Sequence, residues 1–109
     1  MDSLLITNDG QTRILTLNRP DKRNALNDEL IAALKAALRE ADADESVRVI
    51  VIRGAGKDFC SGADLSSIQK IANASYEENL EDARSLAELF LLIRKVRVPV
   101  IAAIPRLFV

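Results

Sequence analysis

The sequence predicts a single α/β domain, and three observations support that fold class. The length, 109 residues, is typical of one ordinary domain. Short apolar segments with the composition of strands alternate with longer segments that show helical periodicity. The resulting order, ββαβααβ, contains no repeat of fixed period, low-complexity tract or linker. We therefore expect one sheet packed against helices.

The N-terminal segment predicts a β-hairpin. Residues 4–7 and 12–17 are rich in apolar and β-branched side chains, as strands are. The tripeptide Asn8-Asp9-Gly10 between them is a turn signal. A polar loop over 18–23 follows, in which Pro20 ends the second strand.

A long amphipathic helix is predicted next. Asn27 is expected as its N-cap, with Asp28 and Glu29 in its first turn. The acidic stretch 42–46 ends it near residue 43. One helical face carries the apolar positions Leu30, Leu34, Ala37, Leu38 and Ala41.

Residues 47–53 predict a strand that is apolar almost without interruption from 49 to 52. Such a run is typical of a strand that is covered on both faces, so we expect full burial here. A loop over 54–58 and a short helix over 66–71 are predicted after it.

Another long helix is predicted in the C-terminal third. Ser75, with Glu78 three residues later, fits a capping box at its start. Pro99 ends it, and residues 100–104 predict a further buried strand. Arg94, Lys95 and Arg97 are interpreted as charges that complement its C-terminal dipole; an anion-binding patch is the alternative. The positions that trace the helix are Leu80, Ala83, Ala87, Phe90, Leu91 and Arg94.

Composition excludes several classes of function. The net charge is −1, and acidic and basic residues alternate, so neither nucleic acid nor a membrane surface is an expected partner. Histidine is absent, which excludes Ser-His-Asp and Cys-His nucleophile systems and any His-ligated metal within these residues. Cys60 is the single cysteine, so no internal disulfide forms, and a reducing compartment fits. The N-terminus does not read as a signal peptide, so we expect a cytoplasmic location.

The most informative segment is Phe59-Cys60-Ser61-Gly62-Ala63-Asp64-Leu65. It follows an apolar strand and precedes a predicted helix. Small residues there let the backbone approach a ligand closely. Backbone N–H groups at a helix start have no intrahelical partner and favour negative charge. The segment therefore predicts a site that can hold an oxyanion.

Three segments in order resemble the enoyl-CoA hydratase/isomerase (crotonase) family. The stretch from Asn18-Arg19-Pro20 to Asn24-Ala25-Leu26-Asn27 looks like the family's N-terminal substrate loop. Residues 59–65 look like its first oxyanion-hole loop, and 98–104 look like the strand that leads to the second. The resemblance covers 1–104 and implies the N-terminal part of a crotonase-like spiral of ββα units, truncated after the strand at 100–104. Residues 105–109 do not match the family pattern and form a separate tail.

The resemblance also implies the chemistry. Family members act on a carbon–carbon double bond conjugated to a coenzyme A thioester, and two backbone N–H groups stabilise the enolate-like oxygen. The N–H of Ala63 would be one of them. Coenzyme A is part of the substrate, so no separate cofactor and no metal are expected. The residues expected to contact the acyl-CoA thioester are Lys22, Arg23, Ala25, Leu26, Ser61, Gly62, Ala63, Asp64 and Leu65.

Two residues of this region have competing interpretations. Asp64 has the position of a general acid or base, but it more simply caps the helix that begins near Leu65. Cys60 has the chemistry of a nucleophile, but nothing nearby in the sequence activates it, which favours a small packed residue.

Activity is expected to be incomplete. Relatives place a second oxyanion donor and acidic catalytic residues after the last strand, and residues 105–109 match neither. One hypothesis is therefore a shortened enzyme of the family. The alternative is a non-catalytic fragment that binds acyl-CoA weakly or associates with full-length subunits; a third is a small α/β domain without a coenzyme A connection. We also expect marginal stability or self-association into a homo-oligomer, because apolar strands would be left partly uncovered.

Overall fold

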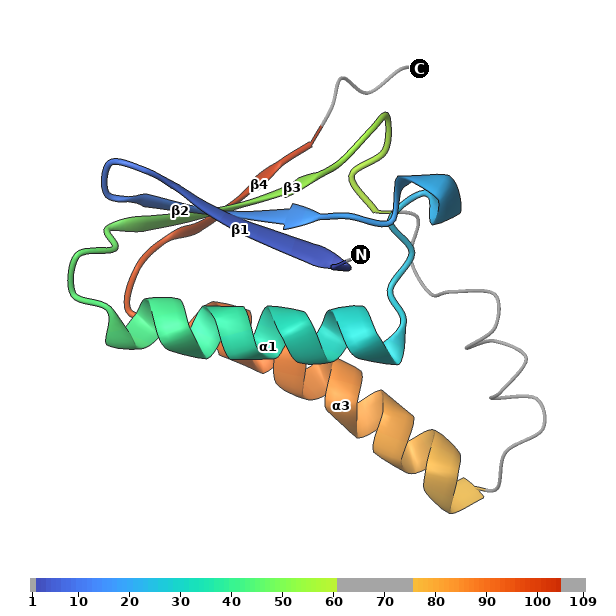
Figure 1. Ribbon diagram of the computed structural model, residues 1–109. Helices are drawn as coiled ribbons and strands as arrows, with labels where there is room; N and C mark the ends of the chain where they lie inside the picture. The colour runs from blue at the N-terminus through green and yellow to red at the C-terminus, as the bar shows by residue number, and fades with distance from the viewer. Residues whose placement is uncertain (1, 61–75, 105–109) are drawn as a thin grey trace.

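A four-stranded sheet in the order β1-β2-β3-β4 organises the molecule (Figure 1). The computed structural model describes residues 2–60 and 76–104. Both long helices of these residues lie on the same side of the sheet (Figure 1). The strands are β1 (Leu4–Asp9), β2 (Thr12–Leu17), β3 (Val49–Gly54) and β4 (Val100–Ala103), and the helices are η1 (Pro20–Lys22), α1 (Asp28–Ala43) and α3 (Tyr76–Lys95).

The strand directions bring three chain segments to one edge of the sheet. β1 and β2 form the predicted antiparallel hairpin, with Gly10 in the left-handed region at φ 60°. β2 pairs with β3 in parallel, and β3 pairs with β4 in parallel. The carboxyl ends of β2, β3 and β4 therefore meet at the same edge, and the segments that follow β2 and β3 leave the sheet there.

Helix α1 forms as its local signals predict. The Asn27 side-chain Oδ1 accepts a hydrogen bond from the Leu30 N–H at 2.9 Å, which satisfies a backbone donor at the helix start. The predicted apolar face is buried against the sheet, and the helix ends at Ala43 with Asp44 as its C-cap. The buried residues of α1 are Leu30, Leu34, Lys35, Ala37, Leu38 and Ala41.

Arg97 caps a different helix from the one that the sequence predicts. Its guanidinium donates to the carbonyl oxygens of Ala41, Asp42 and Asp44, and its backbone N–H donates to Asp42 Oδ1 at 2.8 Å. Arg97, which follows the end of α3, thus satisfies the last carbonyls of α1, a helix that ends more than fifty residues earlier.

The two C-terminal strands are less covered than predicted. β3 begins at Val49, because the Val47 N–H donates to the Asp44 carbonyl in the preceding turn. Val49 and Val51 are only half-buried, and β4 exposes most of its residues. The reason is topological: β4 lies at the edge of the sheet, and within residues 2–60 and 76–104 the helices cover one face alone.

Helix α3 was predicted correctly, but the residues that trace it face solvent. Phe90 is 54% exposed, whereas its neighbour Leu89 is 2% exposed and belongs to the core. The helix packs on α1 through the stripe that contains Leu86, Leu89 and Ile93. The predicted helix over 66–71 and the Ser75 cap lie outside the described residues. Within the described part of the chain, no helix has the length and apolar character that a bilayer span requires.

Candidate functional site

The predicted substrate loop and the loop after β3 lie against each other at the carboxyl edge of the sheet. The Ala55 N–H donates to the Leu17 carbonyl at 2.8 Å, which joins the first residue after β3 to the last residue of β2. Ligands of open α/β sheets bind outside the carboxyl ends of the strands. A binding site at this edge stays a prediction.

The loop after β2 has an irregular but ordered backbone. Pro20 begins the short η1 helix, and Arg23 and Asn24 both adopt left-handed conformations, at φ 55° and 56°. Asn tolerates this region better than most residues, whereas Arg23 incurs strain of about 1 kcal/mol or more. The strained turn points the chain back toward β3, and the Asn24 N–H closes it by donating to the Arg19 carbonyl at 2.8 Å.

The side chain of Asn24 joins this loop to the next one. Its Nδ2 donates to the carbonyl oxygens of Ala55 at 2.8 Å and Asp58 at 2.7 Å. Its Oδ1 accepts from the Arg19 N–H at 2.8 Å. Asn24 is 0% exposed, and these partners satisfy the buried amide that would otherwise be costly to place there.

Gly54 allows the two loops to approach so closely. A Cβ atom at this position would lie 2.2 Å from the Asp58 carbonyl oxygen and 2.7 Å from Asn24 Nδ2. Both distances are far below van der Waals contact, so any side chain here would push the loops apart. Gly54 ends β3 and thereby sets the spacing at the carboxyl edge.

Two cations are presented to solvent at this edge. Lys22 is exposed at the end of η1. The Arg23 side chain is 71% exposed and pairs with Asp58, with Nε 3.3 Å from Oδ2 and Nη2 3.5 Å from Oδ1. An exposed pair of this kind contributes about 0–1 kcal/mol, so an incoming anion can replace the Asp58 carboxylate at little cost. A phosphate group suits such an arginine because it accepts two parallel N–H bonds.

Ala25 and Leu26 have structural roles in the same loop. Ala25 is buried; its N–H donates to the Lys22 carbonyl at 3.1 Å, and its carbonyl accepts from the Arg19 guanidinium. Leu26 is half-buried and packs against the core. Contact of these two residues with a ligand stays a prediction.

The remaining predicted contacts lie outside the described residues, namely Ser61, Gly62, Ala63, Asp64 and Leu65. The segment that leads to them is described as far as Cys60. Phe59 and Cys60 are half-buried and pack against the core, which agrees with the interpretation of Cys60 as a packed residue. The oxyanion role of the Ala63 N–H stays a prediction.

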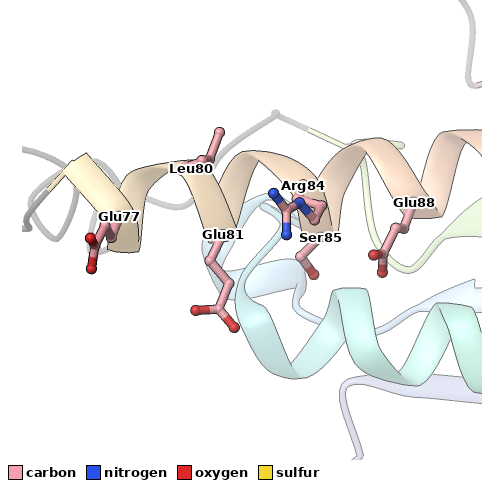
Figure 2. Close-up of a pocket in the computed structure, with 6 residues that line it drawn as sticks. All are labelled: Glu77, Leu80, Glu81, Arg84, Ser85 and Glu88. Atoms are coloured by element: carbon pink, nitrogen blue, oxygen red, sulfur yellow. The ribbon is translucent and has the colours of Figure 1, made fainter.

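A separate concavity of about 590 Å³ lies along α3, and Figure 2 shows the side chains that line it. Its lining has three acids and one base, and this excess of negative charge does not favour the phosphates of coenzyme A substrates. One acid, Glu88, is also 3.3 Å from Lys35 Nζ of α1. None of the residues predicted to bind substrate belongs to this lining, which consists of Glu77, Leu80, Glu81, Arg84, Ser85 and Glu88.

Sequence reasoning did not find the two contacts that join the loops. The loop motif includes Asn24 but predicts no role for its side chain, and it predicts no pairing of Arg23 with Asp58. Their partners lie 31 to 35 residues away in the sequence, so no local pattern reports them. A usable signal was the combination of an Asn in a polar loop with a Gly at the end of the following apolar strand.

The sequence model of the family described as enoyl-CoA hydratase/isomerase matches residues 9–105. A protein of Mycobacterium tuberculosis strain H37Rv, named "Probable enoyl-CoA hydratase EchA14", is 38% identical over 103 residues, which are 94% of this chain and 39% of that protein.

Solved structures agree. An enoyl-CoA hydratase from Mycobacterium smegmatis is 36% identical, with a TM-score of 0.88 over 95% of this chain and 40% of that one. An enoyl-CoA hydratase from Shewanella pealeana is 32% identical, with a TM-score of 0.88 over 92% of this chain and 38% of that one. The chain thus spans about 40% of the length of these relatives and has the crotonase fold over that part. By sequence and by fold, the chain belongs to the enoyl-CoA hydratase/isomerase family.

Proposed function

We propose that this chain binds the coenzyme A portion of an acyl-CoA thioester at the carboxyl edge of its sheet. The observation that carries the proposal is the position of Arg23. The family match includes its loop, and the structure presents its guanidinium to solvent beside the loop that leads to residues 61–65. Lys22 adds a second cation within one residue of it. Phosphate groups of coenzyme A are the anions that such a pair would hold.

The thioester end of the ligand belongs near Ala63 in this proposal. The Ala63 N–H would donate to the oxygen that becomes negative when the double bond reacts. Loss of one such donor typically lowers the rate by about 10²–10³. Hydratase or isomerase turnover also needs a second donor and acids placed at the reacting carbons.

We therefore propose ligand binding without complete turnover for these 109 residues, and association with full-length subunits as the second candidate. The apolar residues left exposed on β4 and α3 favour the second candidate, because they offer a surface for another polypeptide. We propose a cytoplasmic location for the chain under both candidate functions.

Calorimetric titration with butyryl-CoA, which has no conjugated double bond to react, tests the binding proposal. Loss of the conjugated absorbance of crotonyl-CoA tests turnover in the same preparation. We expect measurable binding and no turnover. Turnover would contradict the proposal of binding alone, and absence of binding would contradict the site.

Two variants locate the site. Arg23→Gln removes the charge and the two-pronged donor while leaving the buried loop bonds, so we expect affinity to fall by about tenfold. Arg39→Gln, on the exposed side of α1, removes an equal charge away from this edge and is the matched control. Equal losses in the two variants would show that net charge, not the loop, decides binding.

A further inference from the structure

We propose that Asn24 is a positioning residue: its side-chain amide sets the loop over 18–24 against the loop over 55–58, and thereby sets where Arg23 stands relative to the end of β3. The inference deepens the proposed function and rests on it for the ligand. Asn24 itself is buried and touches no ligand in this proposal.

The hydrogen-bond pattern of Asn24 suits this role. Its amide bonds three main-chain groups, the N–H of Arg19 and the carbonyl oxygens of Ala55 and Asp58. Main-chain partners cannot change rotamer to follow a displaced amide, so the three bonds together define one arrangement of the loops. Outside η1, these loops lack the repetitive hydrogen bonding of a helix or strand, so the Asn24 bonds set their separation together with the close approach at Gly54 and the Ala55 N–H bond to Leu17.

The ion pair between Arg23 and Asp58 depends on the position of Asn24. Asn24 bonds the main chain of Asp58, and the side chain of Asp58 pairs with Arg23, the residue before Asn24. Gly54 permits this arrangement of the loops, since its missing Cβ leaves room for both Asn24 Nδ2 and the Asp58 carbonyl. Displacing Asn24 would therefore move Arg23 and Asp58 relative to each other without removing either charge.

Asn24→Gly is the primary test. Glycine retains the left-handed backbone at φ 56° but removes all three side-chain bonds. We expect the dissociation constant for butyryl-CoA to rise by about tenfold, because three hydrogen bonds that hold the loops are lost. Leu34→Ala, in the core of α1, is the matched control: it lowers stability but leaves both loops intact, so its affinity should stay within about twofold of the original at a temperature where the protein is folded.

Asn24→Asp supplies a readout that mere destabilisation would not produce. The carboxylate keeps the acceptor for the Arg19 N–H but faces the carbonyl oxygens of Ala55 and Asp58, which are 2.8 and 2.7 Å away. Protonation would restore one donor. The affinity of each variant is divided by that of the unmodified chain at the same pH, so that effects of the neighbouring Asp58, Arg19 and Arg23 cancel. On this scale, the affinity of Asn24→Asp should recover as the pH falls, and that of Asn24→Gly should not.

Hydrogen exchange separates this inference from the proposed function. The Arg19 and Ala55 amides should exchange faster in Asn24→Gly than in Leu34→Ala, even in a preparation that does not bind coenzyme A. Absence of butyryl-CoA binding with this local acceleration would contradict the proposed function and support the positioning role. Equal exchange and equal affinity in Asn24→Gly and Leu34→Ala would overturn the positioning role.

Discussion

On the helix-covered face of the sheet, Leu15 and Ile50 are completely buried, whereas on the opposite face Ile101 is 51% exposed. The strand register places these residues in separate rows. Ile14, Val51 and Ile101 pair in sequence across β2, β3 and β4, while Leu15, Ile52 and Ala102 form the next row on the other side. Side chains alternate between the two faces, so one strand contributes to both rows.

The comparison shows that the apolar composition of a strand does not indicate whether helices cover both of its faces. From Val49 to Ile52, β3 is apolar on both faces, with Val49 and Val51 on one and Ile50 and Ile52 on the other; Arg53 lies on the same face as Val49 and Val51. Only the second pair is buried, and it belongs to the core cluster that includes the apolar residues of α1. The open face carries Val49, Val51 and Ile101 beside the polar Thr16 and Arg53, and no helix of the described residues covers it.

The largest expected effect is on the covered face. Ile50→Ala should lower the free energy of unfolding by about 2–5 kcal/mol, because it removes a side chain from a packed core and leaves a cavity. Ile101→Ala, the same change on the next strand, should cost less than about 1 kcal/mol because half of that side chain is already in water. Urea unfolding of both variants measures the difference. Equal losses would mean that the open face is covered in solution.

A second test asks whether copies of the chain cover the open face. Ile101→Lys should weaken self-association by about tenfold or more, which corresponds to about 1.4 kcal/mol, since an edge-strand lysine opposes strand pairing and apolar contact. Sedimentation velocity over a range of concentrations gives the association constant. Ala36→Lys, on the exposed side of α1, adds the same charge elsewhere and should leave association unchanged. An unchanged constant in Ile101→Lys would place the contact on another surface.

A smaller effect is expected where α1 ends. Arg97→Met keeps the long apolar stem but removes the donors to the Ala41, Asp42 and Asp44 carbonyls, so the free energy of unfolding should fall by about 1–2 kcal/mol. Arg94→Met, near the exposed end of α3, is the control and should change stability by less than about 0.5 kcal/mol. Thermal unfolding followed by circular dichroism compares the two. Similar losses would show that Arg97 does not cap α1 in solution.

The smallest expected effect depends on pH. The Ser46 hydroxyl, the Ser46 N–H and Arg13 all favour the charged form of Asp44, which lowers its pKa from the usual 3.8. A lowered pKa in the folded state means that Asp44 stabilises the fold above pH 3.8 and that this contribution is lost as the pH falls through the folded pKa. The variant Asp44→Asn should therefore lose less stability on acidification.

Urea unfolding between about pH 6 and about pH 3 measures that loss. Asp9→Asn, at the exposed end of β1, is the control and should follow the unmodified chain. If Asp44→Asn also follows it, the contacts of Asp44 contribute nothing to acid stability.

Much of the fold and part of the site could be predicted. Asn27, the apolar period of α1 and the turn at Gly10 act within a few residues, so their signals are complete in the sequence. The structure places the loop around Arg23 at the carboxyl edge of the sheet, and its role in binding stays a prediction. The function of Asn24 could not be predicted, because its carbonyl partners are supplied by a segment more than thirty residues later.

By itself, the sequence determined the order of the described strands and long helices, the N-cap and apolar period of α1, and membership of the family. The tertiary structure decided which face of β3 and β4 is covered, which helix Arg97 caps, and which groups hold Asn24 and Arg23. The physical reason is the range of the interactions. Caps, turns and helical periods form between near neighbours in the chain, whereas burial and loop-to-loop hydrogen bonds require segments that meet only when the sheet has assembled.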